Sequence, residues 1–221
     1  MSKVTISQQT MVVLKNFATI NSSILIREGN QLKTISVGEN VVSQYTCSEE
    51  FPQTFGIYDL NQFLAGLSLF NNPVLDFDNQ EYVTIRSGSR SAKYYFSNPE
   101  ITLKAAPEKG IKFPGADLEF TIRQEDITTL QKASAVYDIC DLKFQSVGGS
   151  VILSLVDKEN ETSNLFSLEL PGDNTGEYEF FMKIENIRLF PGDYHVKISK
   201  HLITEWKHSA IDLLYYIALE P

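Results

Sequence analysis

The feature that most constrains this chain is an internal repetition of helix-forming and strand-forming segments. Residues 5–20 (TISQQTMVVLKNFATI) and 121–136 (TIRQEDITTLQKASAV) have the same form, and so do 55–67 (FGIYDLNQFLAGL) and 181–190 (FMKIENIRLF). Each pair of segments occupies corresponding places in the two halves of the chain. Similarity of this kind indicates a duplicated domain.

The length and the composition of the middle segment suggest where the two domains meet. The chain has 221 residues, which is enough for two domains of about 110 residues. Two prolines and two glycines interrupt the strand pattern at residues 105–115 (AAPEKGIKFPG). We therefore expect domains at 1–108 and 109–221, with a linker at about 105–115.

Four helices are predicted, and short strands fill the rest of the chain. Ser7 and Asp59 are suitable N-cap residues for the first two helices, and apolar side chains recur at helical spacing after each cap. The segments between the helices are short and rich in Val, Ile, Tyr and Phe, and Arg86-Ser-Gly-Ser-Arg90 indicates a hairpin turn. The predicted class is α+β, with two helices packed on antiparallel sheets in each domain. The predicted helices are 7–19, 59–70, 124–136 and 184–189.

No motif of a catalytic or phosphate-binding site occurs in the sequence. The patterns GxSxG, GxGxxG and HExxH are absent, as is a P-loop. His195, His201 and His208 are not spaced as ligands of a tetrahedral metal. The carboxylate pairs Glu49-Glu50 and Asp76/Asp78 are expected in solvated turns or edge strands. We therefore predict a protein that is not an enzyme and that needs neither a metal nor a cofactor.

Charge and hydropathy limit the partners of the chain. The longest apolar run, residues 213–219, is far shorter than the ~20 residues that span a bilayer, so no membrane association is expected. The formal net charge is −9, which taken alone argues against nucleic acid. That argument concerns the sum of the charges, however, and not their distribution.

The basic residues near the predicted helices suggest a different interpretation. Lys15 and Lys132 project away from the apolar stripes of the first and third helices, so the helices would show a weakly basic face while the strands carry the acidic excess. A lysine on an exposed helix face also serves solubility, and this pattern alone leaves both interpretations open. The residues expected to face DNA are Lys3, Lys15, Arg123, Lys132, Lys183 and Arg188.

Two long segments resemble a known family. Residues 13–26 (VLKNFATINSSILI) and 57–70 (IYDLNQFLAGLSLF) closely resemble the sliding clamps of T-even-like tailed bacteriophages, which are DNA polymerase processivity factors. Later segments are similar in register, including IKFPGA, RQEDITTLQKAS, LFPGDYHVKIS and YYIALE. The chain departs from the family in having no basic residue on the second helix, so the other helices would have to supply the positive charge.

The resemblance implies a fold, an assembly and a set of partners. The fold would be the DNA clamp fold, with three subunits joined head to tail in a homotrimeric ring whose hole is lined by helices. Such a ring encircles double-stranded DNA without reading its bases and tethers the replicative DNA polymerase. The implied partners also include an ATP-dependent clamp loader and proteins of late viral transcription. The place of action would be the cytoplasm of the infected bacterial host.

The resemblance also implies a partner-peptide pocket. Clamps receive partner peptides in an apolar pocket between their two domains, beside the linker and the C-terminal segment. An exposed apolar groove usually marks a partner site, but these side chains could instead seal the seam between the domains. The matching positions are Val41, Ile111, Phe113, Pro114, Tyr216, Ile217 and Ala218.

A different class of protein is the alternative hypothesis. A β-rich virion or adaptor protein with duplicated domains and no role on DNA would also show the repetition and the acidic net charge. The oligomeric state would discriminate between them, since a ring requires a trimer.

Overall fold

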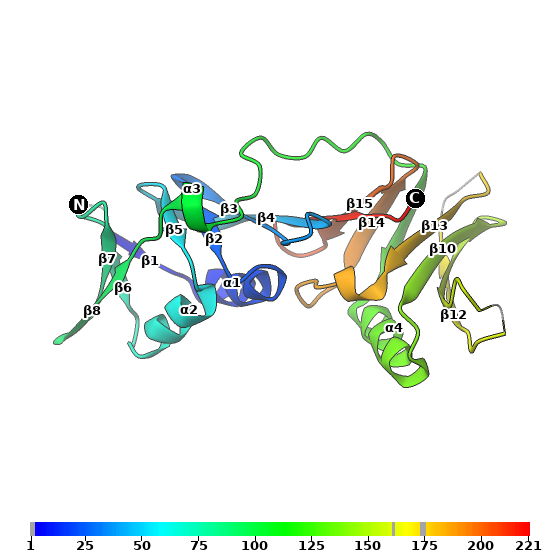
Figure 1. Ribbon diagram of the computed structural model, residues 1–221, viewed down its shortest axis with the longest axis horizontal. Coiled ribbons are helices and arrows are strands. Elements are labelled where there is room, and N and C mark those ends of the chain that lie inside the picture. Colours follow the sequence, from blue (N-terminus) through cyan, green and yellow to red (C-terminus); the bar gives the residue numbers. More distant parts are fainter. Residues whose placement is uncertain (1–2, 161, 173–175) are drawn as a thin grey trace. The chain divides into compact units, whose positions relative to one another are not determined.

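The chain folds into two compact units, seen in the computed structural model of Figure 1. The structure describes residues 3–160, 162–172 and 176–221. The units comprise Met1–Lys109 and Gly110–Pro221.

In the first unit, two helices lie side by side on one side of the antiparallel strands (Figure 1). One sheet has the antiparallel order β1-β6-β7-β8, and β2 pairs with β5 and β3 with β4, again antiparallel. Phe17 of α1 and Phe63 of α2 are almost fully buried. The elements are β1 (Lys3–Thr5), α1 (Gln8–Ile20), β2 (Ile24–Ile26), β3 (Gly29–Ile35), β4 (Val41–Phe51), β5 (Phe55–Ile57), α2 (Leu60–Ser68), β6 (Val74–Asp76), β7 (Tyr82–Ser87), β8 (Arg90–Tyr95) and α3 (Pro99–Thr102).

The second unit repeats the order of strand, helix and antiparallel hairpins. One sheet has the order β12-β11-β10-β13, and β16, β15, β14 and β9 are neighbours in another. Phe144, Tyr194 and Trp206 are almost fully buried, and the Trp206 ring meets the other two edge-on. The elements are β9 (Leu118–Ile122), α4 (Gln124–Tyr137), β10 (Asp141–Val147), β11 (Ser150–Val156), β12 (Phe166–Pro171), β13 (Glu179–Lys183), η1 (Ile184–Asn186), β14 (Tyr194–Ser199), β15 (Ile203–His208) and β16 (Leu213–Ala218).

Three of the four predicted helices are confirmed, and their caps explain where they begin. The Ser7 hydroxyl accepts a hydrogen bond from the Thr10 N–H at 3.2 Å, and the Asp59 carboxylate accepts one from the Gln62 N–H at 2.9 Å. Each bond satisfies a backbone donor that has no partner within the helix.

The fourth predicted helix, 184–189, is wrong. The structure has a single 3₁₀ turn there, η1, and Pro191 soon ends any helical path. Ile184 and Ile187 are both buried, and a 3₁₀ turn aligns residues three apart on one side. The second unit therefore has one long helix and a short turn, and the first has an additional short helix, α3, that the sequence pattern did not predict.

Glu49 corrects a second expectation, because it is buried and not solvated. It lies in the long strand β4, and its carboxylate accepts hydrogen bonds from the Ser7 N–H at 2.5 Å and from the Thr10 hydroxyl at 2.7 Å. Burial alone would raise the pKa of this carboxyl, but the hydrogen bonds outweigh burial and hold the pKa below its usual value. Glu49 thus fixes the start of α1 on the sheet.

Glu49→Gln is expected to lower the free energy of unfolding by about 1–3 kcal/mol at pH 7. Because the folded-state pKa is depressed, the contribution of the carboxylate is present above the unfolded-state value of about 4.3 and is lost as the pH falls through the folded-state value. The difference between wild type and variant should therefore shrink below about pH 4. Urea unfolding at pH 7 and at about pH 3 measures it, with the exposed neighbour Glu50→Gln as the matched control. An equal loss in both variants would contradict the assignment.

The turn that follows η1 holds the start of α4. The Asp193 carboxylate accepts a hydrogen bond from the Gln124 N–H at 2.8 Å, and the Gln124 side chain accepts one from the Gly192 N–H at 2.5 Å. Gly192 has a φ of 150°, and a Cβ at this position would collide with the buried ring of His208. Only glycine fits this position without strain.

Gly192→Ala is expected to destabilise the protein by about 2–4 kcal/mol, because backbone strain and overpacking against His208 add together. Thermal or urea unfolding measures the loss. Gly66→Ala in α2 is the matched control, since its added methyl group would meet nothing within 4 Å and should leave stability unchanged or raise it by up to about 1 kcal/mol. A Gly192→Ala variant as stable as the control would show that the turn tolerates a side chain.

Candidate nucleic-acid interface

The exposed face of α1 carries one charge, that of Lys15. The opposite side of the helix is buried through Val13, Leu14 and Phe17. Lys15 lies three residues after the exposed Val12 and four before the exposed Thr19, so these side chains share a helical face. This face is otherwise uncharged.

The exposed face of α4 has the same character. Ile127, Leu130 and Ala133 are buried on one side, whereas Thr129 and Lys132 are exposed on the other. The acidic residues of this helix, Glu125 and Asp126, lie in its first turn, where they favour the helix dipole.

The long helices hold none of the chain's negative excess. In α1, α2 and α4 together, Lys15 and Lys132 balance Glu125 and Asp126, and α2 has no charged residue at all. The net charge of −9 therefore resides entirely in the other segments. Lys15 lies near the middle of α1 and Lys132 in the second half of α4, so each of these two helices presents a lysine to an anionic ligand.

Three of the other predicted DNA-facing residues are exposed at element ends. Lys3 lies on β1. Arg123 precedes α4, and its guanidinium pairs with Glu125 at 3.3 Å, with both side chains about 70% exposed. Arg188 follows η1, where its Nε donates a hydrogen bond to the Glu185 carbonyl at 3.2 Å. The exposed ion pair of Arg123 contributes little to stability, so its guanidinium can exchange Glu125 for a phosphate.

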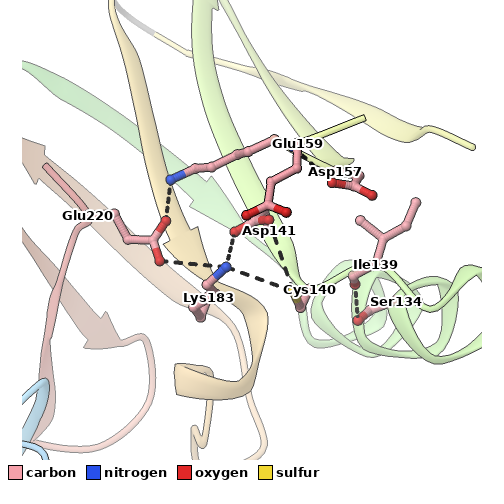
Figure 2. Close-up of polar contacts among 9 residues, drawn as sticks. Ser134, Ile139, Cys140, Asp141, Asp157, Glu159, Lys183 and Glu220 are labelled. Carbon is pink, nitrogen blue, oxygen red and sulfur yellow. Dashed lines mark hydrogen bonds and ion pairs between the residues drawn. The ribbon is translucent and has the colours of Figure 1, made fainter. Parts of the chain in front are cut away.

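Lys183 lies in a different environment. Figure 2 shows its ammonium between the carboxylates of Asp141 and Glu220, with Nζ–O distances of 2.5 and 3.7 Å. The hydrogen bond with Asp141 favours the charged form and raises the pKa of the lysine. Two carboxylates thus balance the charge locally, so Lys183 adds little net attraction for phosphate.

The residues of the predicted partner pocket differ in exposure. Val41 and Ile217 are buried, Ile111 and Phe113 are half-buried, and Pro114 and Ala218 are exposed.

Tyr216 is buried in β16, opposite Glu205 of β15. Burial, together with the Glu205 carboxylate, raises the pKa of Tyr216 to about 12. Its hydroxyl therefore stays protonated at neutral pH and can act as a hydrogen-bond donor.

Two contacts that position the helices could not be found from sequence motifs. Glu49 reaches the start of α1 across 42 residues, and Asp193 reaches the start of α4 across 69. The only sequence signals are a carboxylate at a buried position of an alternating strand pattern and the Pro191-Gly192 turn before Asp193.

Comparison with solved structures identifies the fold. The chain is similar to the proliferating cellular nuclear antigen of Entamoeba histolytica, with a TM-score of 0.72, 12% identity and coverage of 100% of this chain and 99% of that one. It is also similar to the PCNA2–PCNA3 complex of Sulfolobus tokodaii, with a TM-score of 0.65, 13% identity and coverage of 99% and 98%. The fold is therefore the α+β clamp fold of the nuclear-antigen type, with two domains in each chain.

Sequence comparison narrows the class to a family. Residues 7–97 match the family described as "DNA polymerase processivity factor", and residues 119–221 match "gp45 sliding clamp, C terminal". The sliding clamp of Vibrio phage KVP40 is 30% identical over 97% of this chain and 98% of that protein. Those of Escherichia phage RB69 and Enterobacteria phage T4 are 28% and 29% identical over 87% and 86% of this chain and 86% and 84% of theirs. The chain belongs to the gp45-type sliding clamps of bacteriophages, the processivity factors of DNA polymerase.

Membership of this family confirms the expected role in DNA replication. The protein is a non-catalytic replication factor that acts with DNA polymerase on DNA, and the virion or adaptor alternative is not supported. Within the residues that the structure describes, no helix is both long enough and apolar enough to cross a membrane.

Proposed function

We propose that three copies of this chain close head to tail into a ring that encircles duplex DNA and keeps the replicative polymerase on its template. The single observation that carries this proposal is the distribution of charge, since the long helices have no net charge in a chain of −9. Duplex DNA carries one negative charge per ~1.7 Å of its axis, so its sequence-independent binding requires cations facing the phosphates.

The proposed lining residues have different roles. Lys15 and Lys132 supply the central charge, repeated three times around the ring, and Lys3, Arg123 and Arg188 add weaker contacts at its margins. Lys183 contributes mainly to the local structure of the second domain, because Asp141 and Glu220 hold its ammonium. Few and weak contacts suit a sliding ring, in which topological enclosure supplies the persistence that binding affinity does not.

Two free sheet edges support the head-to-tail closure. In the described residues, no strand pairs with the outer side of β8, and β12 has no second strand ladder besides that with β11; a single bridge joins Gly172, just after β12, to Phe120 of β9. Each of the two strands is six residues long. Unpaired edges present donors and acceptors that attract another strand. Arg90 and Lys93 are exposed on β8 and Glu169 on β12, so the two edges also have opposite charge. A ring joined by unlike surfaces closes when one edge of each subunit meets the other edge of the next.

The proposal also includes the domain bounds and the other partners. The domains are 1–108 and 109–221. The predicted pocket of the linker and β16 receives partner peptides of the polymerase. An ATP-dependent loader opens the ring, and proteins of late transcription use the same surface. The protein acts in the cytoplasm of the infected bacterial host.

Retention on circular DNA tests the ring directly. The loaded protein should stay on a nicked circular duplex during gel filtration and leave once a restriction enzyme cuts the circle. Light scattering should give about three times the chain mass of 25.0 kDa. Equal retention on circular and linear DNA would instead show ordinary surface binding, and a stable monomer would exclude the ring.

A further inference from the structure

We propose that a groove on the second unit is a second docking site for partner proteins, and that it accepts a segment with a large apolar side chain next to acidic residues. The groove has a volume of about 520 Å³. Its apolar lining comes from Val156, Leu165 and Phe181, and two lysines, Lys143 and Lys158, flank it. We call it the Leu165 groove. None of its residues belongs to the predicted pocket of the linker and β16, so the inference goes beyond the proposed function.

The floor of the groove is a rigid sheet. Lys143 of β10 lies directly opposite Phe181 of β13 in the antiparallel register, and Val156 is the last residue of β11, the neighbouring strand. The side chains therefore rise from three adjacent strands and need no rearrangement to form a binding surface. A preformed surface lowers the entropic cost of binding.

One wall of the groove is held in place by its own turn. The Asp157 carboxylate accepts a hydrogen bond from the Glu159 N–H at 2.9 Å. The Asn160 side-chain oxygen accepts bonds from the N–H and the hydroxyl of Thr162, at 3.1 and 2.8 Å. These bonds lie in the segment that leads from the end of β11 to Leu165.

The apolar side chains of the groove are partly exposed within the residues that the structure describes. Leu165 is 62% exposed, and Phe181 and Val156 are half-buried in the open groove. Large apolar side chains that are exposed together usually mark an interaction site. A leucine or phenylalanine side chain of a partner would bury these groups, which favours an apolar anchor.

The charge of the groove determines which residues are favoured beside the apolar anchor of the partner. Among the lining residues that the structure describes, Lys143 and Lys158 stand against one carboxylate, Asp157, so this described lining has a net positive charge on a chain of −9. The Lys158 ammonium lies 4.6 Å from the centre of the Phe181 ring. The lysines pair with Glu179 and Glu220, which do not line the groove, so an acidic partner residue can compete for them. Complementary charge therefore points to an acidic segment.

Glu220 links the groove to the C-terminal segment. Its backbone bridges to Phe181, and its carboxylate contacts Lys158 on one side and Lys183 on the other. Figure 2 shows Glu220 and Asp141 on either side of Lys183. A partner carboxylate that binds Lys158 would weaken the contact between Lys158 and Glu220. Binding in the groove would therefore change the environment of the residues that follow β16.

Binding of a defined peptide tests the proposal without DNA, loader or polymerase. The probe is a dye-labelled peptide, Asp-Asp-Leu-Phe-Asp-Asp, and the full-length protein is titrated while fluorescence anisotropy is recorded. Methyl NMR spectra should show shifts at Val156 and Leu165. A peptide with lysines in place of the aspartates should bind at least about tenfold more weakly, and 0.5 M salt should weaken the acidic peptide.

Leu165→Ser should weaken peptide binding about tenfold or more, because it removes an exposed apolar contact. Leu69→Ser is the matched control: Leu69 is 71% exposed in the first unit, and its substitution should leave binding unchanged. Unchanged affinity in Leu165→Ser, or methyl shifts only at β16, would overturn the proposal. Peptide binding does not require a closed ring. A negative result here would therefore not contradict the ring proposal, and a negative result in the circular-DNA assay would not contradict the groove proposal.

Discussion

Reversal of two charges, Lys15→Glu with Lys132→Glu, is expected to reduce clamp-dependent DNA synthesis about tenfold or more. Each Lys→Glu substitution changes the charge by −2, so the double variant lowers the net charge of each chain by four. The change is repeated on the three subunits of the proposed ring. Each lost phosphate contact also removes the release of a counterion, which makes the binding of DNA less favourable, most strongly at low salt. Primer extension on a circular template with loader and polymerase measures the loss.

A matched control separates local charge from net charge. Lys200 and Lys207 are exposed on a turn and on strand β15, and Lys200→Glu with Lys207→Glu changes the net charge by the same amount. We expect the control to keep most of its activity and the helix variant to remain a trimer in light scattering. Equal loss in both variants would show that overall repulsion from DNA, and not the helix faces, determines loading.

The sequence predicted the long helices well because local signals determine them. Ser7 and Asp59 cap α1 and α2, and the apolar stripes of α1, α2 and α4 are those that the structure buries. The segment after β13 has similar apolar spacing, but too few residues precede Pro191 for a helix. A 3₁₀ turn is enough to bury both Ile184 and Ile187. Periodicity alone does not distinguish these outcomes over six residues.

The candidate site was less predictable, because its electrostatics depend on distant partners. Lys183 was assigned to DNA from its place before a predicted helix, but Asp141 and Glu220, 42 and 37 residues away in the chain, pair with it. Glu49 was assigned to solvent from its acidic neighbour, yet the strand pattern of β4 turns it inward to α1. Lys15 and Lys132, by contrast, lie on exposed faces of regular helices, where sequence spacing alone determines direction.

Arg90→Glu with Lys93→Glu on β8 is expected to convert the proposed trimer to monomers of 25.0 kDa at micromolar concentration. The two substitutions make the β8 edge acidic, like the β12 edge that carries Glu169, and like charges across paired strands are destabilising. At roughly 1 kcal/mol for each of three contacts, ring formation would weaken by about 3 kcal/mol, or two orders of magnitude. Processive synthesis requires the closed ring, so it should fall with the trimer. Light scattering across a concentration series measures the association.

Charge exchange makes this prediction specific to the two edges. Adding Glu169→Lys to the β8 variant restores opposite charge across the contact and should recover part of the trimer, whereas Glu169→Lys alone should weaken it. The side chains of Arg90, Lys93 and Glu169 are all exposed, so none of the substitutions alters the buried core. The monomeric variants should therefore unfold at the same urea concentration as monomeric wild type. A trimer that survives the β8 reversal, or a loss that Glu169→Lys does not reduce, would mean that other strands join the subunits. The equal lengths and opposite charges of β8 and β12 would then need a different explanation.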